Sequence, residues 1–257
     1  MNLKYSITKA HSPIIATAIH DGHIIDTALS PYLALQEHER FREEDPYTAY
    51  LAELPVTQIV VASSRFQTDL NRRREEAVYR QPEDAWGLKV WHPELRDELI
   101  SQLLEGYDAF YSDITLLLDD TINRFGRFVV LDIHSYNYRR AAPDREAAAS
   151  DNPEINIGTA HNGDQWNKMG DRLVRYLSHY RVMGRRPDVR ENVKFGGGAF
   201  SEWINARYGA YGCVFSLEFK KTFMDEWTGR ADIRHLKELK RMMHGCLPYL
   251  EYELDAQ

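Results

Sequence analysis

The chain has 257 residues, of which 43% are hydrophobic and 28% are charged, a balance typical of a globular protein with a proper core. Its 32 basic and 39 acidic residues give a formal net charge of -7, which argues against a general nucleic-acid binder, because such proteins normally carry a basic patch. No apolar run approaches the roughly 18 residues that a membrane-spanning helix needs, and the N-terminus lacks the apolar core of a signal peptide. We therefore expect no nucleic-acid partner and no membrane segment.

The cysteine content points to a reducing compartment. The two cysteines, Cys213 and Cys246, lie far apart in the sequence and form no CxxC pair. A disulfide framework is therefore not expected. We expect a cytoplasmic protein, and the sequence leaves its oligomeric state open.

Short apolar runs that end in polar residues alternate with helical patterns along the chain. The runs predict strands at 13–20, 58–63, 127–134, 155–159 and 213–219. Apolar side chains at three- and four-residue spacing predict helices at about 36–54, 92–123, 165–181 and 234–246. Near-continuous apolar strands suit a sheet buried on both faces, and their alternation with helices favours parallel order. We predict one α/β domain, residues 1–257, with a central mixed, mostly parallel sheet flanked by helices.

Polar side chains suited to catalysis follow the predicted strands. The first strand ends at His20, the third ends at His134, and the last contains Glu218. The second strand runs into SRFQTDLNR at 64–72, and His161 follows the fourth. Ligands bind beyond the carboxyl ends of strands in open α/β sheets, so these side chains are expected to meet. Imidazole nitrogens and carboxylate oxygens bind catalytic zinc, and a carboxylate not bound to the metal can act as general base. The pattern therefore predicts one Zn²⁺ at this edge of the sheet.

Each of these segments alone also has a structural interpretation. A strand-terminal histidine is more often a hydrogen-bonded structural residue than a ligand. The DLNR segment could be a capped helix N-terminus, and Glu218 could pair with a nearby lysine. Their combination in this order favours the metal site.

The order of the motifs resembles the N-formylglutamate amidohydrolase family, which is related to the zinc carboxypeptidase superfamily. The resemblance covers about residues 13–229, and its segments are AIHDGH at 18–23, REEDPYT at 42–48, SRF and DLNR within 64–72, HS at 134–135, the glycine-rich 196–200 and SLE at 216–218. It implies a zinc-dependent hydrolase that cleaves an amide or formamide bond. The implied substrate is small and carries a carboxylate, such as N-formylglutamate or a related N-acyl amino acid.

The resemblance also implies roles for single residues. Glu218 would be the general base, and Arg65 would stabilise the oxyanion that develops during attack. Asn71 and Arg72 would bind the substrate carboxylate, with Tyr136 as a further substrate contact. The segment FMDEWTG at 223–229 also resembles a family motif; its chemistry is not assigned, and it could shape a pocket wall or a lid.

The third metal ligand is less defined than the two histidines. Carboxypeptidases take two ligands from HxxE, whereas this chain reads HDGH at 20–23. The implied metal ligands are His20, Asp45 and His134, with Glu44 and His23 as alternatives. Zinc accepts either arrangement, and the acidic segment could also be a solvated helix start. Asp69 would accept a hydrogen bond from a ligating imidazole and fix its tautomer.

Two other functions stay open. A zinc carboxypeptidase-like peptidase would use Asn71 and Arg72 to bind the terminal carboxylate of a peptide. A non-catalytic metal-binding or carboxylate-binding protein could retain the scaffold, although Glu218 beside His20 and His134 argues against it. The expected partner is a small acidic molecule or a short peptide.

Overall fold

A computed structural model of the chain describes residues 2–92 and 95–256, and these residues build one seven-stranded sheet with the order β1-β3-β2-β4-β7-β5-β6. The strands are β1 Tyr5–Thr8, β2 Ile14–Ala18, β3 Thr57–Val61, β4 Phe128–Tyr136, β5 Ile155–Gly158, β6 Val189–Glu191 and β7 Gly212–Lys220. Strands β3, β2, β4 and β7 are parallel neighbours, whereas β1 and β5 join the sheet in antiparallel pairs. The predicted mixed, mostly parallel sheet is confirmed.

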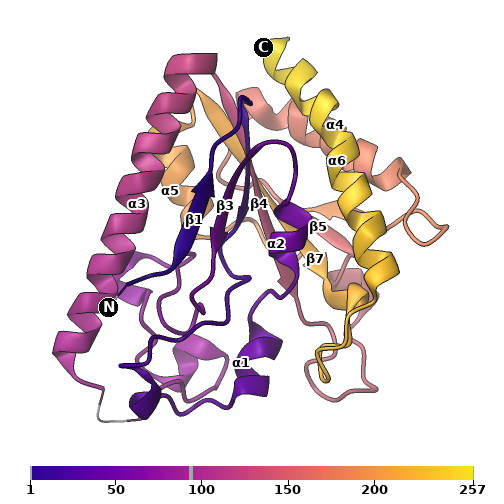
Figure 1. The fold of residues 1–257 in the computed structure, drawn as a ribbon. Helices are drawn as coiled ribbons and strands as arrows, with labels where there is room; N and C mark the ends of the chain where they lie inside the picture. Colours follow the sequence, from indigo (N-terminus) through magenta and orange to yellow (C-terminus); the bar gives the residue numbers. More distant parts are fainter. Residues whose placement is uncertain (1, 93–94, 257) are drawn as a thin grey trace.

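Helices cover both faces of this sheet (Figure 1). They are α1 Glu37–Glu43, α2 Thr48–Ala52, α3 Asp97–Phe125, α4 Asn167–His179, α5 Ala199–Tyr208 and α6 Ile233–Asp255. Short 3-10 helices lie at Ser30–Tyr32, Arg74–Glu76, Pro82–Ala85, Ala149–Asp151, Asp164–Trp166 and Lys221–Phe223. Helices α3 and α5 pack on one face, and α2, α4 and α6 pack on the other. Within the described ranges, no helix combines the length and apolar character needed to cross a bilayer.

The alternation of side chains along β4 explains where the polar site lies. Leu131 and Ile133 pack into the core under α4 and α6. Val130 points to the other face and packs in the core under α3 and α5. Because successive side chains alternate across a strand, Asp132 and His134 share the face of Val130. Along this face, the side chains are apolar at Val130 and polar at Asp132 and His134, toward the carboxyl end of the strand. A polar cavity lies at that end and is lined in part by His134.

The predicted helix 36–54 is two helices, α1 and α2, separated by residues 44–47. Asp45 precedes Pro46, and a residue before proline is disfavoured in the helical region. Tyr47 has a φ of 71°, in the left-handed region. The interruption removes Asp45 from any helix and leaves it free to point toward the sheet.

Other boundaries also differ from the prediction. The predicted helix 92–123 is observed as α3 from Asp97, and its residues 93–94 lie outside the described residues. Helix α6 continues past the predicted end to Asp255 and contains Pro248. The short strands β1 and β6 and the helix α5 were not predicted.

One strand runs in an unexpected direction. Strand β5 is antiparallel to β7, with Ile155 opposite Phe219 and Gly158 opposite Ser216. Its carboxyl end therefore points away from the edge where β2, β3, β4 and β7 end. The prediction that the fourth strand delivers its following residues to the same edge is wrong, and His161 is not among the residues that line the cavity there.

Candidate metal centre and active site

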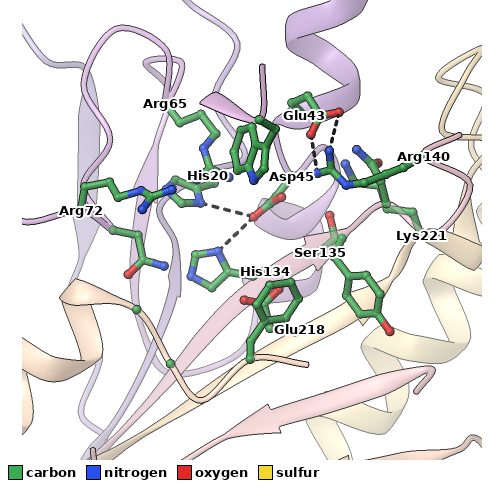
Figure 2. Close-up of a pocket in the computed structure, with 17 residues that line it drawn as sticks. His20, Glu43, Asp45, Arg65, Arg72, His134, Ser135, Arg140, Glu218 and Lys221 are labelled. Carbon is green, nitrogen blue, oxygen red and sulfur yellow. Dashed lines mark hydrogen bonds and ion pairs between the residues drawn. The ribbon is translucent and has the colours of Figure 1, made fainter. Parts of the chain in front are cut away.

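Three buried side chains from separate segments meet at the carboxyl edge of the sheet (Figure 2). His20 follows β2, His134 lies in β4, and Asp45 lies between α1 and α2. The Oδ2 atom of Asp45 is 3.0 Å from Nδ1 of His134 and 3.5 Å from Nδ1 of His20. One ligand atom from each residue lies within 4.8 Å of the others. This set of two imidazole nitrogens and one carboxylate oxygen could hold a metal ion.

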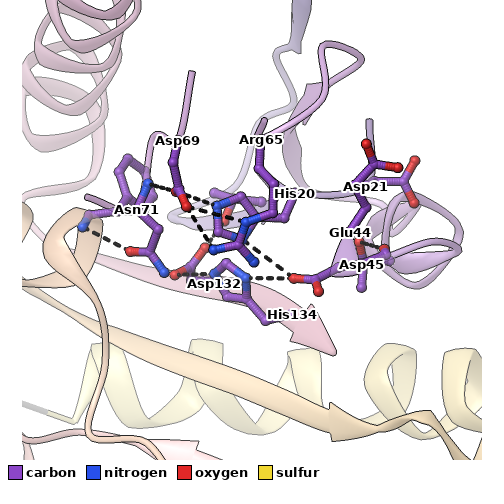
Figure 3. A network of polar contacts seen from close by, with 12 residues as sticks. His20, Asp21, Glu44, Asp45, Arg65, Asp69, Asn71, Asp132 and His134 are labelled. Carbon is purple, nitrogen blue, oxygen red and sulfur yellow. Dashed lines mark hydrogen bonds and ion pairs between the residues drawn. The ribbon is translucent and has the colours of Figure 1, made fainter. Parts of the chain in front are cut away.

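The far nitrogen of each imidazole faces a carboxylate (Figure 3). Nε2 of His20 lies 2.8 Å from Oδ1 of Asp69, and Nε2 of His134 lies 3.0 Å from Oδ2 of Asp132. A proton on each Nε2 leaves the two Nδ1 lone pairs directed at the centre. Nδ1 of His20 is buried and has no hydrogen-bond partner in the described structure. Since buried polar atoms are normally paired, this orphaned nitrogen fits a metal ligand.

Asp132 is a candidate functional residue that was not predicted. It is fully buried, accepts a hydrogen bond of 2.6 Å from Oγ1 of Thr17, and faces His134 with its other oxygen. The D-x-H spacing on a strand places both side chains on one face, and this signal was available in the sequence. Asp132 therefore faces Nε2 of His134 in the same way that Asp69 faces Nε2 of His20.

Asp69 orients an arginine as well as a histidine. Its Oδ2 atom accepts hydrogen bonds from Nη2 and Nε of Arg65, at 2.7 and 3.2 Å, and another from the hydroxyl of Tyr79. Burial opposes ionisation, but the charge of Arg65 and the contact with His20 hold the pKa of Asp69 well below its usual range. The Trp86 ring covers Arg65, with the guanidinium carbon 4.9 Å from the ring centroid. One buried carboxylate thus fixes Arg65 beside the candidate metal centre.

The alternative ligands Glu44 and His23 do not reach this centre. The Glu44 carboxylate is fully buried and accepts hydrogen bonds from Oγ of Ser64, Nδ1 of His23 and, at 3.4 Å, Nη1 of Arg40. His23 and Glu44 therefore bind each other. Asp45, the next residue, is the one that faces His20 and His134.

Lys221 holds the same loop from the other side. Its Nζ donates to the carbonyl oxygens of Arg42 and Glu44, at 2.6 and 2.7 Å. Burial lowers the pKa of Lys221 to about 8. The loop that carries Asp45 is therefore held by the Glu44 carboxylate and by the carbonyl oxygens of Arg42 and Glu44. These contacts limit how far Asp45 can move.

Glu218 lies beside the three candidate ligands. It is the register partner of His134 on the neighbouring strand β7, so the two side chains share a face of the sheet. Leu217 and Phe219 pack into the core on the opposite face. Burial raises the pKa of Glu218 to about 7, with the charge of His134 opposing this shift and the Asp45 carboxylate adding to it. A carboxylate with such a pKa can accept and return a proton near neutrality.

The predicted substrate-binding residues also line the cavity. Oδ1 of Asn71 accepts from the backbone N–H of Phe200 at 3.1 Å, which leaves its amide group available. A Cβ atom on Gly198 would lie 2.2 Å from Oδ1 of Asn71, so a larger residue at position 198 would displace the Asn71 side chain. The Arg72 guanidinium has no ion-pair partner among the residues that the structure describes. Tyr136 donates its hydroxyl to the carbonyl of Pro153, so it offers the cavity its ring.

The cavity has a volume of about 240 Å³ and two charged walls. Arg72 lies on one side of the candidate ligands (Figure 2). Arg140, Glu43 and Lys221 lie on the other side (Figure 2). The candidate metal centre therefore lies between Arg72 on one side and Arg140 and Lys221 on the other.

Comparisons with known proteins show the family and the fold to which the chain belongs. An N-formylglutamate amidohydrolase from Ralstonia eutropha JMP134 has a similar structure, with a TM-score of 0.72, 13% identity, and coverage of 97% of this chain and 98% of that chain. A gene product from Agrobacterium tumefaciens, Atu2144, has a TM-score of 0.69, 16% identity, and coverage of 100% and 96%. At these identities the two structures show a shared fold. No match to a curated protein is found. The model of the family described as N-formylglutamate amidohydrolase matches residues 12–224, and the chain belongs to this family.

Proposed function

We propose that this chain is a zinc-dependent amidohydrolase that cleaves the amide or formamide bond of a small N-acyl amino acid, such as N-formylglutamate. Family membership supports amidohydrolase activity. The observation that carries the zinc and substrate assignments is the cavity in which the His20, Asp45 and His134 cluster, Glu218 and Arg72 face one another. A volume of about 240 Å³ favours a small substrate. Because these residues come from all along the chain, we propose that residues 1–257 act as one catalytic domain.

The donor set of the candidate centre suits zinc. Two histidine nitrogens and one carboxylate oxygen match catalytic zinc sites, which keep a fourth position open. When bound there, zinc would lower the pKa of a coordinated water and polarise the scissile carbonyl. Asp69 and Asp132 would keep the imidazoles in the ligating tautomer.

Glu218 carries the proton transfers in this proposal. It takes a proton from the attacking water as the carbon–oxygen bond forms. It then returns that proton to the amine nitrogen as the carbon–nitrogen bond breaks. Its pKa of about 7 in the metal-free cavity suits a group that must act as base and then as acid.

Arginine side chains would bind the charges of the substrate and of the transition state. Arg65, fixed by Asp69, would donate to the oxygen that becomes negative during attack. Arg72 would bind the amino-acid carboxylate, since a guanidinium can donate two parallel hydrogen bonds to a carboxylate. The amide group of Asn71 would donate to the same carboxylate.

A substrate screen tests the proposed function directly. The zinc-loaded chain should hydrolyse N-formyl and other N-acyl amino acids faster than matched dipeptides, because the free ammonium group of a dipeptide would face the cationic side chains of Arg140 and Lys221. The panel contains N-formylglutamate, other N-acyl amino acids and short acidic peptides, and the readout is release of the free amine. Cleavage confined to peptides would favour the peptidase alternative. A chain that binds zinc and carboxylates without cleaving any of them would be a binding protein.

Zinc should bind in a one-to-one ratio and release protons on binding at pH 7. Burial opposes protonation of His134, but the Asp132 and Asp45 carboxylates raise its pKa well above the usual value. The metal-free chain therefore holds a proton on His134 that must leave on ligation, and zinc affinity should increase with pH. Calorimetry in two buffers of different ionisation enthalpy measures the proton count. Asp45→Asn should weaken binding strongly; a pH-independent affinity would contradict the assignment.

Glu218→Gln should abolish turnover and leave zinc stoichiometry and melting temperature close to those of the wild type. Gln keeps the shape and hydrogen bonding of the side chain but cannot accept the proton. A loss of about 10²–10⁴-fold in kcat is expected for a missing general base. A structural role predicts instead a lower melting temperature with retained turnover. Near-normal kcat in this variant would remove Glu218 from the mechanism.

Arg72→Ala should weaken substrate binding much more than zinc binding. Removing one partner of a buried, hydrogen-bonded charge pair costs about 2–5 kcal/mol, so kcat/KM should fall by roughly 30-fold or more. Arg73→Ala is the matched control, because Arg73 is exposed and pairs with Glu202. The wild type should also lose activity on substrates whose α-carboxylate is amidated. Equal kcat/KM with and without that carboxylate would be incompatible with the Arg72 clamp.

A further inference from the structure

We propose that the cavity wall opposite Arg72 is a second anion-binding subsite, in which Arg140 binds a carboxylate carried by the acyl group of the substrate. The inference rests on the proposed function and names a substrate class for it: an N-acyl amino acid whose acyl group is itself acidic. Arg140 would then be a specificity-determining residue that acts on the acyl side of the scissile bond.

The position of Arg140 relative to Arg72 is the first observation. The two guanidinium groups lie on opposite sides of His20, Asp45 and His134 (Figure 2). A substrate whose amino-acid carboxylate lies at Arg72, and whose scissile carbon lies at the candidate ligands, directs its acyl group toward Arg140. A formyl group would leave this side of the cavity unfilled.

The charge of this wall is the second observation. Nη2 of Arg140 lies 2.7 Å from Oε2 of Glu43, and Nη1 lies 3.4 Å from Oε1. This pair holds the guanidinium at the wall while 48% of the Arg140 side chain stays exposed. Lys221 lines the same wall, so two cationic side chains face one carboxylate. The wall keeps a net positive charge that an anionic group of the substrate can neutralise.

The loop that carries Arg140 is held firmly in place. The buried carboxylate of Glu226 accepts hydrogen bonds of 2.8 Å from the backbone N–H groups of both Tyr138 and Arg139. Nη2 of Arg42 donates to the carbonyl oxygens of Arg139 and Arg140, at 3.3 and 3.2 Å. These bonds fix both edges of the loop backbone, so Arg140 leaves the chain at a defined point beside the cavity.

Trp227 reinforces the same contacts. Its Nε1 donates to the carbonyl of Arg139 at 3.0 Å, and its ring lies 3.8 Å from the guanidinium carbon of Arg42. The segment 223–229, whose chemistry the sequence left unassigned, therefore acts by holding the loop of Arg140. Glu226 is a positioning residue in this proposal.

Trp86, which lines the same cavity, also restricts Arg140. Its ring centroid lies 5.4 Å from the guanidinium carbon of Arg140 and 4.9 Å from that of Arg65. Trp86 has a φ of 55°, a left-handed conformation that is unfavourable for a side-chain-bearing residue. Its backbone is held there by an N–H bond to the carbonyl of Pro82. The strained conformation places an aromatic face against both arginines, where cation–π contact limits their motion.

Two acyl groups of equal size test the subsite. The N-succinyl and N-succinamoyl derivatives of one amino acid differ only in a terminal carboxylate or amide. The wild type should prefer the N-succinyl derivative by roughly tenfold or more in kcat/KM, the range of a charged hydrogen bond. Arg140→Gln should bring this ratio close to one. Arg139→Gln is the matched control, because the guanidinium of Arg139 pairs with Asp225 outside this cavity, and it should keep the ratio.

Glu226→Gln tests the positioning role. It should reduce the ratio less than Arg140→Gln does and should act through KM for the N-succinyl derivative, with kcat little changed. Melting temperatures identify a variant that fails to fold. If only folding were affected, both derivatives would lose activity in proportion and the ratio would stay at the wild-type value, which would overturn the role of Glu226.

The outcomes separate this inference from the proposed function. Hydrolysis of N-formylglutamate with a wild-type succinyl-to-succinamoyl ratio near one, or with a ratio unchanged by Arg140→Gln, would overturn the subsite alone. If Arg140→Gln instead alters the discrimination between N-formylglutamate and N-formylglutamine, Arg140 binds the amino-acid side chain and its placement on the acyl side is wrong. A zinc-loaded chain that hydrolyses none of these amides would overturn both proposals.

Discussion

The interaction on which the site depends is the burial of Asp45 between two imidazoles. Ionised carboxylates are costly to bury unless they are paired, and Asp69 and Asp132 are buried behind the same two histidines. Arg65 balances the charge of Asp69, and a proton on His134 balances part of the remainder in the metal-free chain. A divalent cation at the centre would replace that proton and satisfy the orphaned nitrogen of His20. The three buried carboxylates therefore favour a metal ion electrostatically, in addition to the ligand atoms that the site supplies.

Much of the surrounding structure fixes the position of Asp45. The helical pattern of residues 36–54 must be interrupted for this residue to reach the sheet, and Pro46 with the left-handed Tyr47 provides the interruption. Glu44 points the opposite way into a buried cluster with Ser64 and His23, and Lys221 binds the carbonyl of Glu44. A buried salt-bridge cluster is weak evidence for stability, but it is well suited to specifying a single loop conformation. In the proposed function, Glu44 and His23 would serve the candidate metal centre by fixing the loop of Asp45, without being ligands.

The sequence predicted the sheet and the meeting of His20, His134 and Glu218 because parallel strands place their carboxyl ends at one edge. The residue pattern alone did not separate Asp45 from Glu44, since neighbouring residues in an irregular loop differ only in side-chain direction, and only the family resemblance favoured Asp45. The direction of β5 was missed because the periodicity of a short apolar strand is the same in parallel and antiparallel pairs. Strand β1 alternates half-buried and exposed side chains and β6 has 3 residues, so neither shows the continuous apolar run by which the other strands were recognised. The D-x-H spacing shows that Asp132 shares a face with His134, but it does not show that Nε2 of His134 turns toward Asp132, so the role of Asp132 was missed.

The acidic net charge of the chain and an anionic substrate are compatible because charge acts locally. At physiological ionic strength, interactions between exposed charges are largely screened beyond about 8 Å. The substrate would therefore respond mainly to the cavity walls, where Arg65, Arg72, Arg140 and Lys221 gather. Asp69 and Glu43 balance two of these cations, whereas Arg72 has no ion-pair partner among the described residues. An anionic substrate would meet its least compensated cation at Arg72 and a partly compensated one at Arg140. In the proposed function, this difference would make Arg72 the stronger of the two anion-binding side chains.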